Sequence, residues 1–441
     1  MIKCELAHYY AYKDSGVEWI GQVPAHWTIT HLKRFCTKIT DGAHTSPDLS
    51  SSDYPFLTVV NLDNGVLDFK NCLYTSSADY EILVRNGCQP KKHDVLYSKD
   101  GTISETAVIH ENINFVVGSS FIIIRPRLKV SEPRYLCYML QSPIMRYQAR
   151  VYVKGASLPR ISIFNIIKLI SVLPPASEQK VIADYLDTKI AQIDHKIDLL
   201  VKKAVKYIEL KQSLIYETVT RGLDKTVTMK DSGVEWIGEV PEHWDVKRVK
   251  EVSFIFNGAT PKSSVAENWE GNYPWITPDD LGKLNSKFIT DSKRMITKVG
   301  YESCGASMCP IGSVVISCRA PIGHIGILSI EASTNQGCKT LVLNPSIVNN
   351  LFVFYTLLSS KPKLESLGRG TTFIELSTKE LGLFTFALPP LYEQKAIADY
   401  LDAKTAHIAF IIETINTLLE KLRELCKTLI NDVVTGKIKV V

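Results

Sequence analysis

The chain has 441 residues, of which 45% are hydrophobic and 22% are charged, and its formal net charge is +5. This length exceeds what one hydrophobic core normally serves, so we expect at least two domains. No apolar stretch approaches the roughly 20 residues of a membrane span, and the N-terminus lacks the features of a signal peptide, so we expect a cytoplasmic protein. The ten cysteines contain no C-x-x-C pair, which favours free packed thiols over a zinc site.

The first recognisable element is a peptide that occurs twice. Residues 13–27 read KDSGVEWIGQVPAHW, and residues 230–244 read KDSGVEWIGEVPEHW. We interpret the tryptophans of both copies as anchors that pin the following module to the rest of the chain, although plain core aromatics are an alternative. These tryptophans are Trp19, Trp27, Trp236 and Trp244. The histidine before the second tryptophan of each copy is interpreted as structural.

A β-rich module follows each copy of this peptide. Residues 94–109 correspond in order to residues 313–328, and residues 154–162 correspond to residues 369–377, although few residues are identical. Short runs of β-branched residues that end at Pro, Gly, Ser or Asp predict strands. Apolar residues at helical spacing near the end of each module predict helices. We therefore expect two modules that mix strands and helices.

The first module contains a long stretch without acidic residues, between Glu132 and Glu178. Six basic residues lie in it and alternate with tyrosines: Arg134, Arg146, Arg150, Lys154, Arg160 and Lys168. Such a stretch suits binding to a phosphate backbone. A solvated basic surface without a nucleic-acid partner is the alternative that this stretch leaves open.

A second repeat follows each module and predicts a long helix. Residues 173–187 read LPPASEQKVIADYLD, and residues 388–402 read LPPLYEQKAIADYLD. Beyond each Pro-Pro pair, apolar residues recur at alternating steps of three and four, which is the repeat of a coiled-coil seam. The principal seam residues are Leu186, Ile190, Ile193 and Ile197 in the first helix and Leu401, Ile408, Ile412 and Ile415 in the second. We expect each helix to end at a glycine, Gly222 or Gly436.

A helix with such a stripe needs a partner, and the nearest one is the other copy. We therefore expect the α+β fold class, with two α/β modules joined by two long helices. The helices should form an intramolecular antiparallel coiled coil in a pseudo-two-fold circular arrangement, with residues 13–27 meeting the second helix near Gly436. A parallel coil between two chains is the alternative. The expected regions are residues 1–172 (first module), 173–229 (first helical region), 230–387 (second module) and 388–441 (second helical region).

Motifs of catalysis are missing from the sequence. It has no phosphate-binding G-x-x-x-x-G-K-[ST] loop and no G-x-G-x-x-G or G-x-S-x-G motif. Asp279, followed by Asp291 and Lys293, has the order of residues found in metal-dependent nucleases. This pattern is common by chance, and the first module has Asn61 near the corresponding place. We therefore do not expect an enzyme.

The doubled motifs K-D-S-G-V-E-W-I-G-x-V-P-x-H-W and L-P-P-x-x-E-Q-K-x-I-A-D-Y-L-D closely resemble the specificity subunit of type I restriction-modification systems. The resemblance implies two target-recognition domains that each read one half of a bipartite, asymmetric target in double-stranded DNA, while the helices set the spacer. It implies that methyltransferase (modification) subunits and endonuclease/translocase (restriction) subunits assemble with this chain in DNA methylation and restriction. S-adenosylmethionine, Mg²⁺ and ATP are then expected only on those partners, and no membrane is involved. A coiled-coil scaffold that binds proteins without reading DNA is the alternative.

The residues that read DNA are expected in loops that correspond between the modules and carry hydrogen-bond donors. In the first module they are Ser98, Lys99, Thr102, Ser119, Ser120, Lys154, Ser157 and Arg160. In the second module they are Arg319, Asn335, Gln336, Lys339, Arg369, Thr371 and Thr372. Amide side chains suit adenine and cationic ones suit guanine, so the sharpest candidates are Arg319, Asn335, Gln336 and Arg369. Hydrogen bonding within local turns is the alternative role for each of them.

Overall fold

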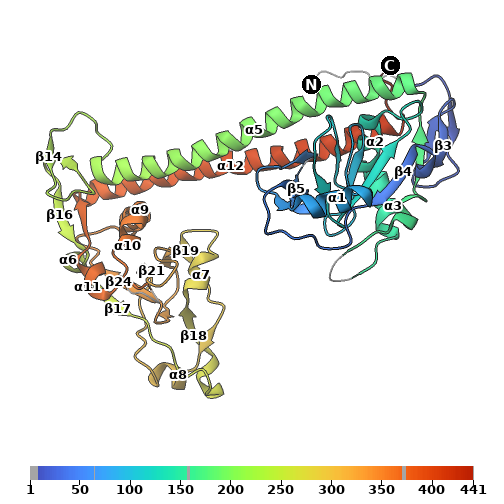
Figure 1. Cartoon of the computed structure of the whole chain (residues 1–441). Coiled ribbons are helices and arrows are strands. Elements are labelled where there is room, and N and C mark those ends of the chain that lie inside the picture. The colour runs from blue at the N-terminus through green and yellow to red at the C-terminus, as the bar shows by residue number, and fades with distance from the viewer. Residues whose placement is uncertain (1–7, 64, 156–158, 370–373, 441) are drawn as a thin grey trace. The chain divides into compact units, whose positions relative to one another are not determined.

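The computed structural model describes residues 8–63, 65–155, 159–369 and 374–440 (Figure 1). It divides into two compact units, of which the first combines residues up to 200 with residues from 416 onward, and the second contains residues 201–415. The two long helices, α5 (Ala176–Arg221) and α12 (Leu391–Val434), are each shared between the units. Each unit therefore contains one module, the start of one long helix and the end of the other.

The first unit is built mainly from short strands. They are β1 (Tyr12–Asp14), β2 (Gln22–Pro24), β3 (Thr28–His31), β4 (Cys36–Asp41), β5 (Tyr54–Leu57), β6 (Leu62–Asp63), β7 (Val66–Leu67), β8 (Leu73–Thr75), β9 (Val95–Ser98), β10 (Thr106–Val108), β11 (Val116–Val117), β12 (Phe121–Pro126) and β13 (Ile170–Leu173). The helices are η1 (Leu32–Arg34), η2 (Val59–Asn61), α1 (Ser77–Arg85), α2 (Pro133–Gln141), α3 (Pro143–Val151) and α4 (Ile163–Ile166). The main sheet is antiparallel in the order β10-β9-β12-β4, and a smaller sheet has the order β11-β5-β8.

The second unit repeats this plan. Its strands are β14 (Met229–Asp231), β15 (Glu239–Pro241), β16 (Asp245–Arg248), β17 (Ser253–Asn257), β18 (Trp269–Ile276), β19 (Phe288–Ile289), β20 (Met295–Ile296), β21 (Val314–Ser317), β22 (Ile325–Leu328), β23 (Ser333–Thr334), β24 (Cys338–Leu343) and β25 (Thr385–Leu388). Its helices are α6 (Val249–Val252), η3 (Ala266–Asn268), α7 (Pro278–Gly282), α8 (Lys298–Glu302), α9 (Asn350–Ser359), α10 (Lys361–Ser366) and α11 (Thr378–Leu383). The main sheet has the order β17-β24-β21-β22-β19, so β19 extends the arrangement seen in the first unit.

The predicted mixture of strands and helices is confirmed in both modules. The β-branched run at residues 121–126 forms β12, which lies between β9 and β4 and is buried along most of its length. The apolar segments at the end of the modules form the helix pairs α2–α3 and α9–α10. Proline stands at the first turn of α2, where its missing N–H costs no hydrogen bond.

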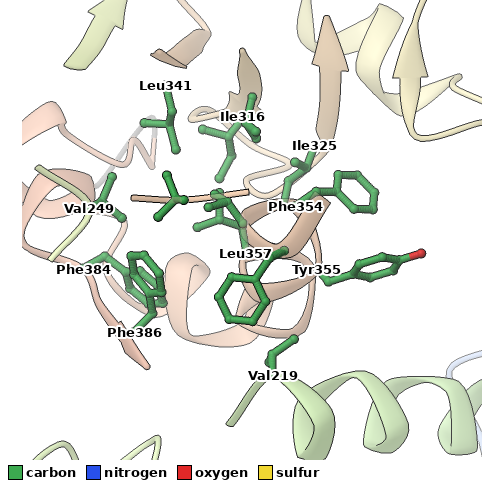
Figure 2. Packing of buried hydrophobic residues seen from close by; sticks show 14 of the residues in the cluster. Val219, Val249, Ile316, Ile325, Leu341, Phe354, Tyr355, Leu357, Phe384 and Phe386 are labelled. Carbon is green, nitrogen blue, oxygen red and sulfur yellow. The ribbon is translucent and has the colours of Figure 1, made fainter. Parts of the chain in front are cut away.

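The larger hydrophobic cluster of the second unit joins its sheet to the long helices (Figure 2). Ile316 of β21 and Leu341 of β24 belong to this cluster, and so does Val219 near the end of α5. Leu401, near the start of α12, belongs to the same cluster and is fully buried. The end of α5 and the start of α12 therefore share one core with the second module.

The first unit shows the reverse combination. Its main cluster contains Leu186 near the start of α5 together with Ile430 and Val433 near the end of α12. Within each unit, the start of one long helix thus packs with the end of the other. The seam residues Ile193, Ile408 and Ile415 are also buried, while Ile190, Ile197 and Ile412 are partly buried.

Both long helices end where the sequence predicts, one residue before or two residues before a glycine. Gly222 and Gly436 each have φ +74°, a conformation that glycine adopts without strain. A Cβ atom on Gly436 would lie 2.4 Å from Cδ of Pro24, so the first copy of the repeated peptide packs against the end of α12. The hydroxyl of Tyr12 also donates a hydrogen bond to the Gly436 carbonyl at 3.2 Å. The predicted contact between residues 13–27 and this glycine is confirmed.

Candidate nucleic-acid interface

Each unit holds its copy of the repeated peptide at the start of a long helix through one glutamate. In the first unit, Glu178 accepts a hydrogen bond from the indole N–H of Trp27 at 2.9 Å and lies 2.6 Å from Nε2 of His26. Glu393 makes the same contacts with Trp244 at 2.9 Å and with His243 at 2.7 Å. The tryptophans are completely buried. The structural role predicted for the two histidines is confirmed.

The next residue of each long helix is a glutamine, and it binds backbone groups that precede α2 or α9 of the module. Gln179 is completely buried, accepts the backbone N–H of Glu132 at 2.8 Å and donates to the carbonyls of Val130 and Pro174. Gln394 binds the corresponding backbone groups of Asn349, Ile347 and Pro389 in the second unit. The identical E-Q pair of the two repeats therefore performs the same task twice.

The other two tryptophans of the repeated peptide take different positions. Trp236 stacks on Phe384 with ring centroids 5.0 Å apart and packs on the second unit's cluster, which includes the end of α5. Trp19 is 47% exposed, and its ring centroid lies 6.1 Å from that of Tyr147 in α3. The expectation that all four tryptophans are anchors is therefore corrected for Trp19, because its ring is about half exposed and contacts a helix of its own module.

The loops expected to read DNA include a turn that has the same geometry in both modules. The turn connects β9 to β10 in the first module and β21 to β22 in the second. The Ser98 hydroxyl donates to the Thr102 carbonyl and accepts the backbone N–H of Glu105 at 2.9 Å. The Ser317 hydroxyl does the same four and seven residues further on, at 2.8 Å in both cases. These hydrogen bonds define which residues of the two turns correspond.

Two residues after each serine, the turn forms an ion pair with a segment that precedes α4 or α11. In the first module, Asp100 of the turn binds Arg160 of the segment, with Nε–Oδ1 at 2.7 Å and Nη2–Oδ2 at 3.1 Å. In the second module, Arg319 of the turn binds Glu375 of the segment, with Nε–Oε2 at 3.0 Å. Asp100 and Arg160 lie opposite each other in an antiparallel bridge, as do Arg319 and Glu375. We name each ion pair with its bridge the loop clamp. The charges of the two clamps are reversed.

Three of the expected DNA-reading residues are buried, which corrects the expectation that they are surface donors. Lys99 directs Nζ to Asp41 at 2.6 Å, and Lys339 directs it to Asn257 at 3.1 Å, with each side chain only 6% exposed. A buried ammonium group needs such a polar partner because its desolvation is costly. Ser98 is also fully buried, and its hydroxyl is used within the turn. These residues brace the loops from inside.

The remaining candidates lie at or near the surface. Thr102, Gln336 and Lys154 are exposed, whereas Ser119, Ser120 and Asn335 are half-buried. The Asn335 side chain accepts the Gly337 N–H at 2.8 Å, which is hydrogen bonding within a local turn, whereas the Ser120 hydroxyl accepts the N–H of the distant Val59 at 3.1 Å. Arg369 is 82% exposed and pairs with Glu380 at 3.0 Å. Ser157, Thr371 and Thr372 lie outside the described residues.

Two arginines of the acid-free stretch are paired with carboxylates and are not free to bind phosphate. Arg134 pairs with Glu132, Asp184 and Asp187, and Arg146 pairs with Glu105 at 2.9 Å. The carboxylates come from both sides of the stretch in sequence, so reading the stretch alone could not reveal them. Arg160, in contrast, lines a cavity with Lys154, Tyr152 and Phe164 while it remains in its clamp.

Sequence reasoning missed the acidic members of this site. Asp41, Asp100 and Glu375 were not predicted because only hydrogen-bond donors were expected to contact DNA. One signal was available: Asp100 and Arg319 occupy corresponding positions of the two modules with opposite charge, as do Arg160 and Glu375. When the charges at two aligned positions are both reversed between the modules, the two positions are expected to form an ion pair.

The nuclease-like pattern has another explanation in the structure. Asp279 binds Lys283 at 2.7 Å, and its hydrogen bond to that ammonium group holds the pKa of the Asp279 carboxyl below its usual value. In the described part of the chain, no group of three or more His, Cys, Asp or Glu residues is placed to hold a metal ion. Along the same residues, no helix combines the length and apolarity needed to cross a membrane.

Comparisons with known proteins agree with the two-module plan. A family model described as the type I restriction modification DNA specificity domain matches twice, at residues 24–203 and at residues 241–421. The putative type I restriction enzyme MjaX specificity subunit of Methanocaldococcus jannaschii is 27% identical, over 99% of both chains. The MjaVIII specificity subunit of the same organism is 29% identical, over 95% of this chain and 94% of the relative.

Solved structures share the fold. A chain from a study of complex assembly and conformational transition of the type I R-M system superposes with a TM-score of 0.73 at 20% identity, covering 93% of this chain and 98% of the other. The HsdS subunit from Thermoanaerobacter tengcongensis superposes with a TM-score of 0.57 at 18% identity, covering 94% and 98%. Because the family model covers most of the chain in two successive matches, the protein belongs to the family of type I restriction-modification DNA specificity subunits.

Proposed function

We propose that the chain reads a bipartite, asymmetric sequence in double-stranded DNA, with one half-site for each module. The observation that carries this proposal is the contrast between the two kinds of contact in each unit. The contacts that hold module to helix are identical in both units, whereas the aligned loops differ in residue type and charge. Two different readers on one repeated frame suit two different half-sites, much as the spacing of repressor half-sites follows from protein geometry.

The long helices act as the spacer between the half-sites. We infer that they form an intramolecular antiparallel coiled coil with approximate two-fold symmetry. This inference is supported by the buried seam and by the pairing of helix starts with helix ends in each unit's core. Phosphate contacts would set the register on DNA, and base-edge contacts would supply the sequence preference.

Methyltransferase subunits, and in the restriction complex endonuclease/translocase subunits, are the proposed partners. S-adenosylmethionine, Mg²⁺ and ATP are proposed to bind to those partners, and this chain is proposed to contribute recognition without catalysis. The family membership supports the assembly. Cytoplasmic location follows from this role, since the host DNA is the substrate.

Exchange of one module tests the proposal. Residues 245–387 are replaced with the matching module of another specificity subunit, and the complex with its modification subunits is produced in cells. Sequencing of methylated positions should show one new half-site and one unchanged half-site. A change in both half-sites would contradict independent reading by the two modules.

A protein-binding scaffold that does not contact DNA is the competing function, and salt dependence separates the two. For the assembled complex, the logarithm of the DNA binding constant should fall linearly with the logarithm of salt concentration, because phosphate contacts release counterions. Binding that is independent of salt would favour the scaffold.

A further inference from the structure

The loop clamps leave part of each arginine free for a ligand. A guanidinium group presents Nε with one Nη along its side and two Nη groups at its end. In the first module, Asp100 occupies the side of Arg160 through Nε and Nη2. In the second module, Glu375 binds Nε of Arg319. Among the residues that the structure describes, no further hydrogen bond occupies the outward N–H groups of Nη1 and Nη2 in either clamp, so they can act as a fork.

Exposure distinguishes these arginines from Lys99 and Lys339, and a carboxylate on Nε distinguishes them from Arg369, whose Nη2 pairs with Glu380. The side chain of Arg160 is 57% exposed and that of Arg319 is 41% exposed, so both forks can reach solvent. Lys99 and Lys339 point inward, as described above. A carboxylate that holds the side of a guanidinium reduces the rotamer freedom lost when its end binds, which favours a fixed bidentate contact.

We propose that Arg160 and Arg319 each read a guanine, one in each half-site, and that Asp100 and Glu375 are the positioning residues that orient them. This inference rests on the proposed function and names residues that would determine its specificity. The two-pronged end of arginine matches O6 and N7 of guanine in the major groove. The reversed charges place this reader on the turn in one module and on the facing segment in the other, at corresponding positions of an antiparallel bridge.

The reversal also explains how the modules can diverge without losing the loop. An ion pair across a bridge closes the loop whichever side carries the cation. Exchanging the two charges therefore keeps the ion pair but moves the arginine to the opposite strand of the bridge. The guanine-binding arginine therefore comes from the segment before α4 in the first module and from the turn after β21 in the second.

The test uses the complex with its modification subunits and a pool of randomised DNA duplexes. The variants Arg160→Lys and Arg319→Lys keep the positive charge and remove the fork. Each should relax the guanine preference at one base pair of one half-site, by roughly tenfold to a hundredfold. The other half-site should stay unchanged, and it reports that the variant complex is folded and assembled.

Two further arms separate base reading from phosphate contact and from stability. Replacing the selected guanine with 7-deazaguanine removes the N7 acceptor, so it should weaken binding by the wild type and not weaken the lysine variant further. Asp100→Asn retains Arg160 but loosens it, so the preference should fall at the same base pair by a smaller factor. Arg125→Lys is the matched control, because Arg125 is held in the same sideways manner by Asp94 at the opposite end of β9.

Several outcomes would overturn the inference. They are an unchanged preference at every base pair in both lysine variants, a uniform weakening on all sequences, or an effect of Arg125→Lys on the same base pair. A wild-type complex that selects no bipartite sequence would instead contradict the proposed function itself. Because each arginine is judged by its own half-site, one module can support the inference while the other opposes it.

Discussion

The contacts at the start of each long helix are the same in both units, whereas those of the two loop clamps differ. At the helix start, Glu178 and Glu393 bind the same tryptophan and histidine with distances that differ by no more than 0.1 Å. In the loop clamp, the two modules keep the backbone bridge and exchange the charges across it. Burial explains the difference, since the tryptophans are completely enclosed whereas the clamp arginines are about half exposed.

This contrast indicates where the chain can vary. A buried polar contact has partners on all sides, so a change in one residue leaves others unpaired. An ion pair whose two partners are exposed, such as Arg319 with Glu375, contributes only about 0–1 kcal/mol to stability, so exchanging its residues costs little. The clamps, where the two modules differ in charge, therefore place their arginines at exposed positions.

The largest expected effect comes from the buried tryptophans. Trp27→Ala and Trp244→Ala should each reduce the stability of their own unit by about 3–5 kcal/mol, because a completely buried large side chain is removed. Hydrogen–deuterium exchange of peptides from each unit, measured across a urea series, resolves the two units. Arg319→Ala, at the clamp whose two side chains are 41% and 37% exposed, should change the same quantity by less than about 1 kcal/mol. An equal loss of stability at the tryptophans and at the clamp arginine would contradict the difference inferred from burial.

A somewhat smaller loss is expected at the buried glutamines. Gln179→Leu and Gln394→Leu keep the approximate volume and leave one backbone N–H and two carbonyls without their partner. Unpaired buried groups cost about 1–3 kcal/mol each before relaxation, so we expect a total of about 3 kcal/mol in either unit.

The control is the adjacent exposed residue of each helix. Lys180→Leu and Lys395→Leu add the same side chain at positions that face solvent, and urea midpoints should barely move. Glutamine variants that behave like these controls would show that water replaces the lost hydrogen bonds.

Sequence patterns predicted the frame much better than the loops. The doubled peptides, the Pro-Pro helix entries and the terminal glycines are local signals, and the structure places each where expected. The partner of each loop residue depends on strand pairing across tens of residues. Lys99 illustrates this, because Asp41 meets it only through the order β9-β12-β4. A lysine in a polar loop therefore looks exposed in sequence although the fold buries it.

The terminal glycines provide the next prediction, which compares the two helix ends. Alanine at either position requires a left-handed conformation, which costs about 1–2 kcal/mol. The added methyl group would lie 2.4 Å from Pro24 at Gly436 and 3.0 Å from the Trp244 ring at Gly222. Gly436→Ala should therefore lower the unfolding midpoint of its unit more than Gly222→Ala does, as measured by the same exchange experiment. Gly101 has φ +68°, and a Cβ atom there would meet nothing within 4 Å. Gly101→Ala therefore measures the cost of the left-handed backbone alone.

The smallest effect expected is a pH dependence of the second unit. Burial opposes ionisation of Glu393, but hydrogen bonds from Trp244, His243 and Tyr392 outweigh it and hold the pKa of this carboxyl below its ordinary value. The contacts therefore stabilise the unit fully above the unfolded pKa of about 4.3, and this contribution is lost as the pH falls through the lower pKa of the folded state. Glu393→Gln should make the acid-induced loss of stability shallower, although it weakens the unit at pH 7. Glu242→Gln removes the same charge from an exposed position of the repeated peptide, so an equal flattening in that variant would assign the effect to net charge rather than to this contact.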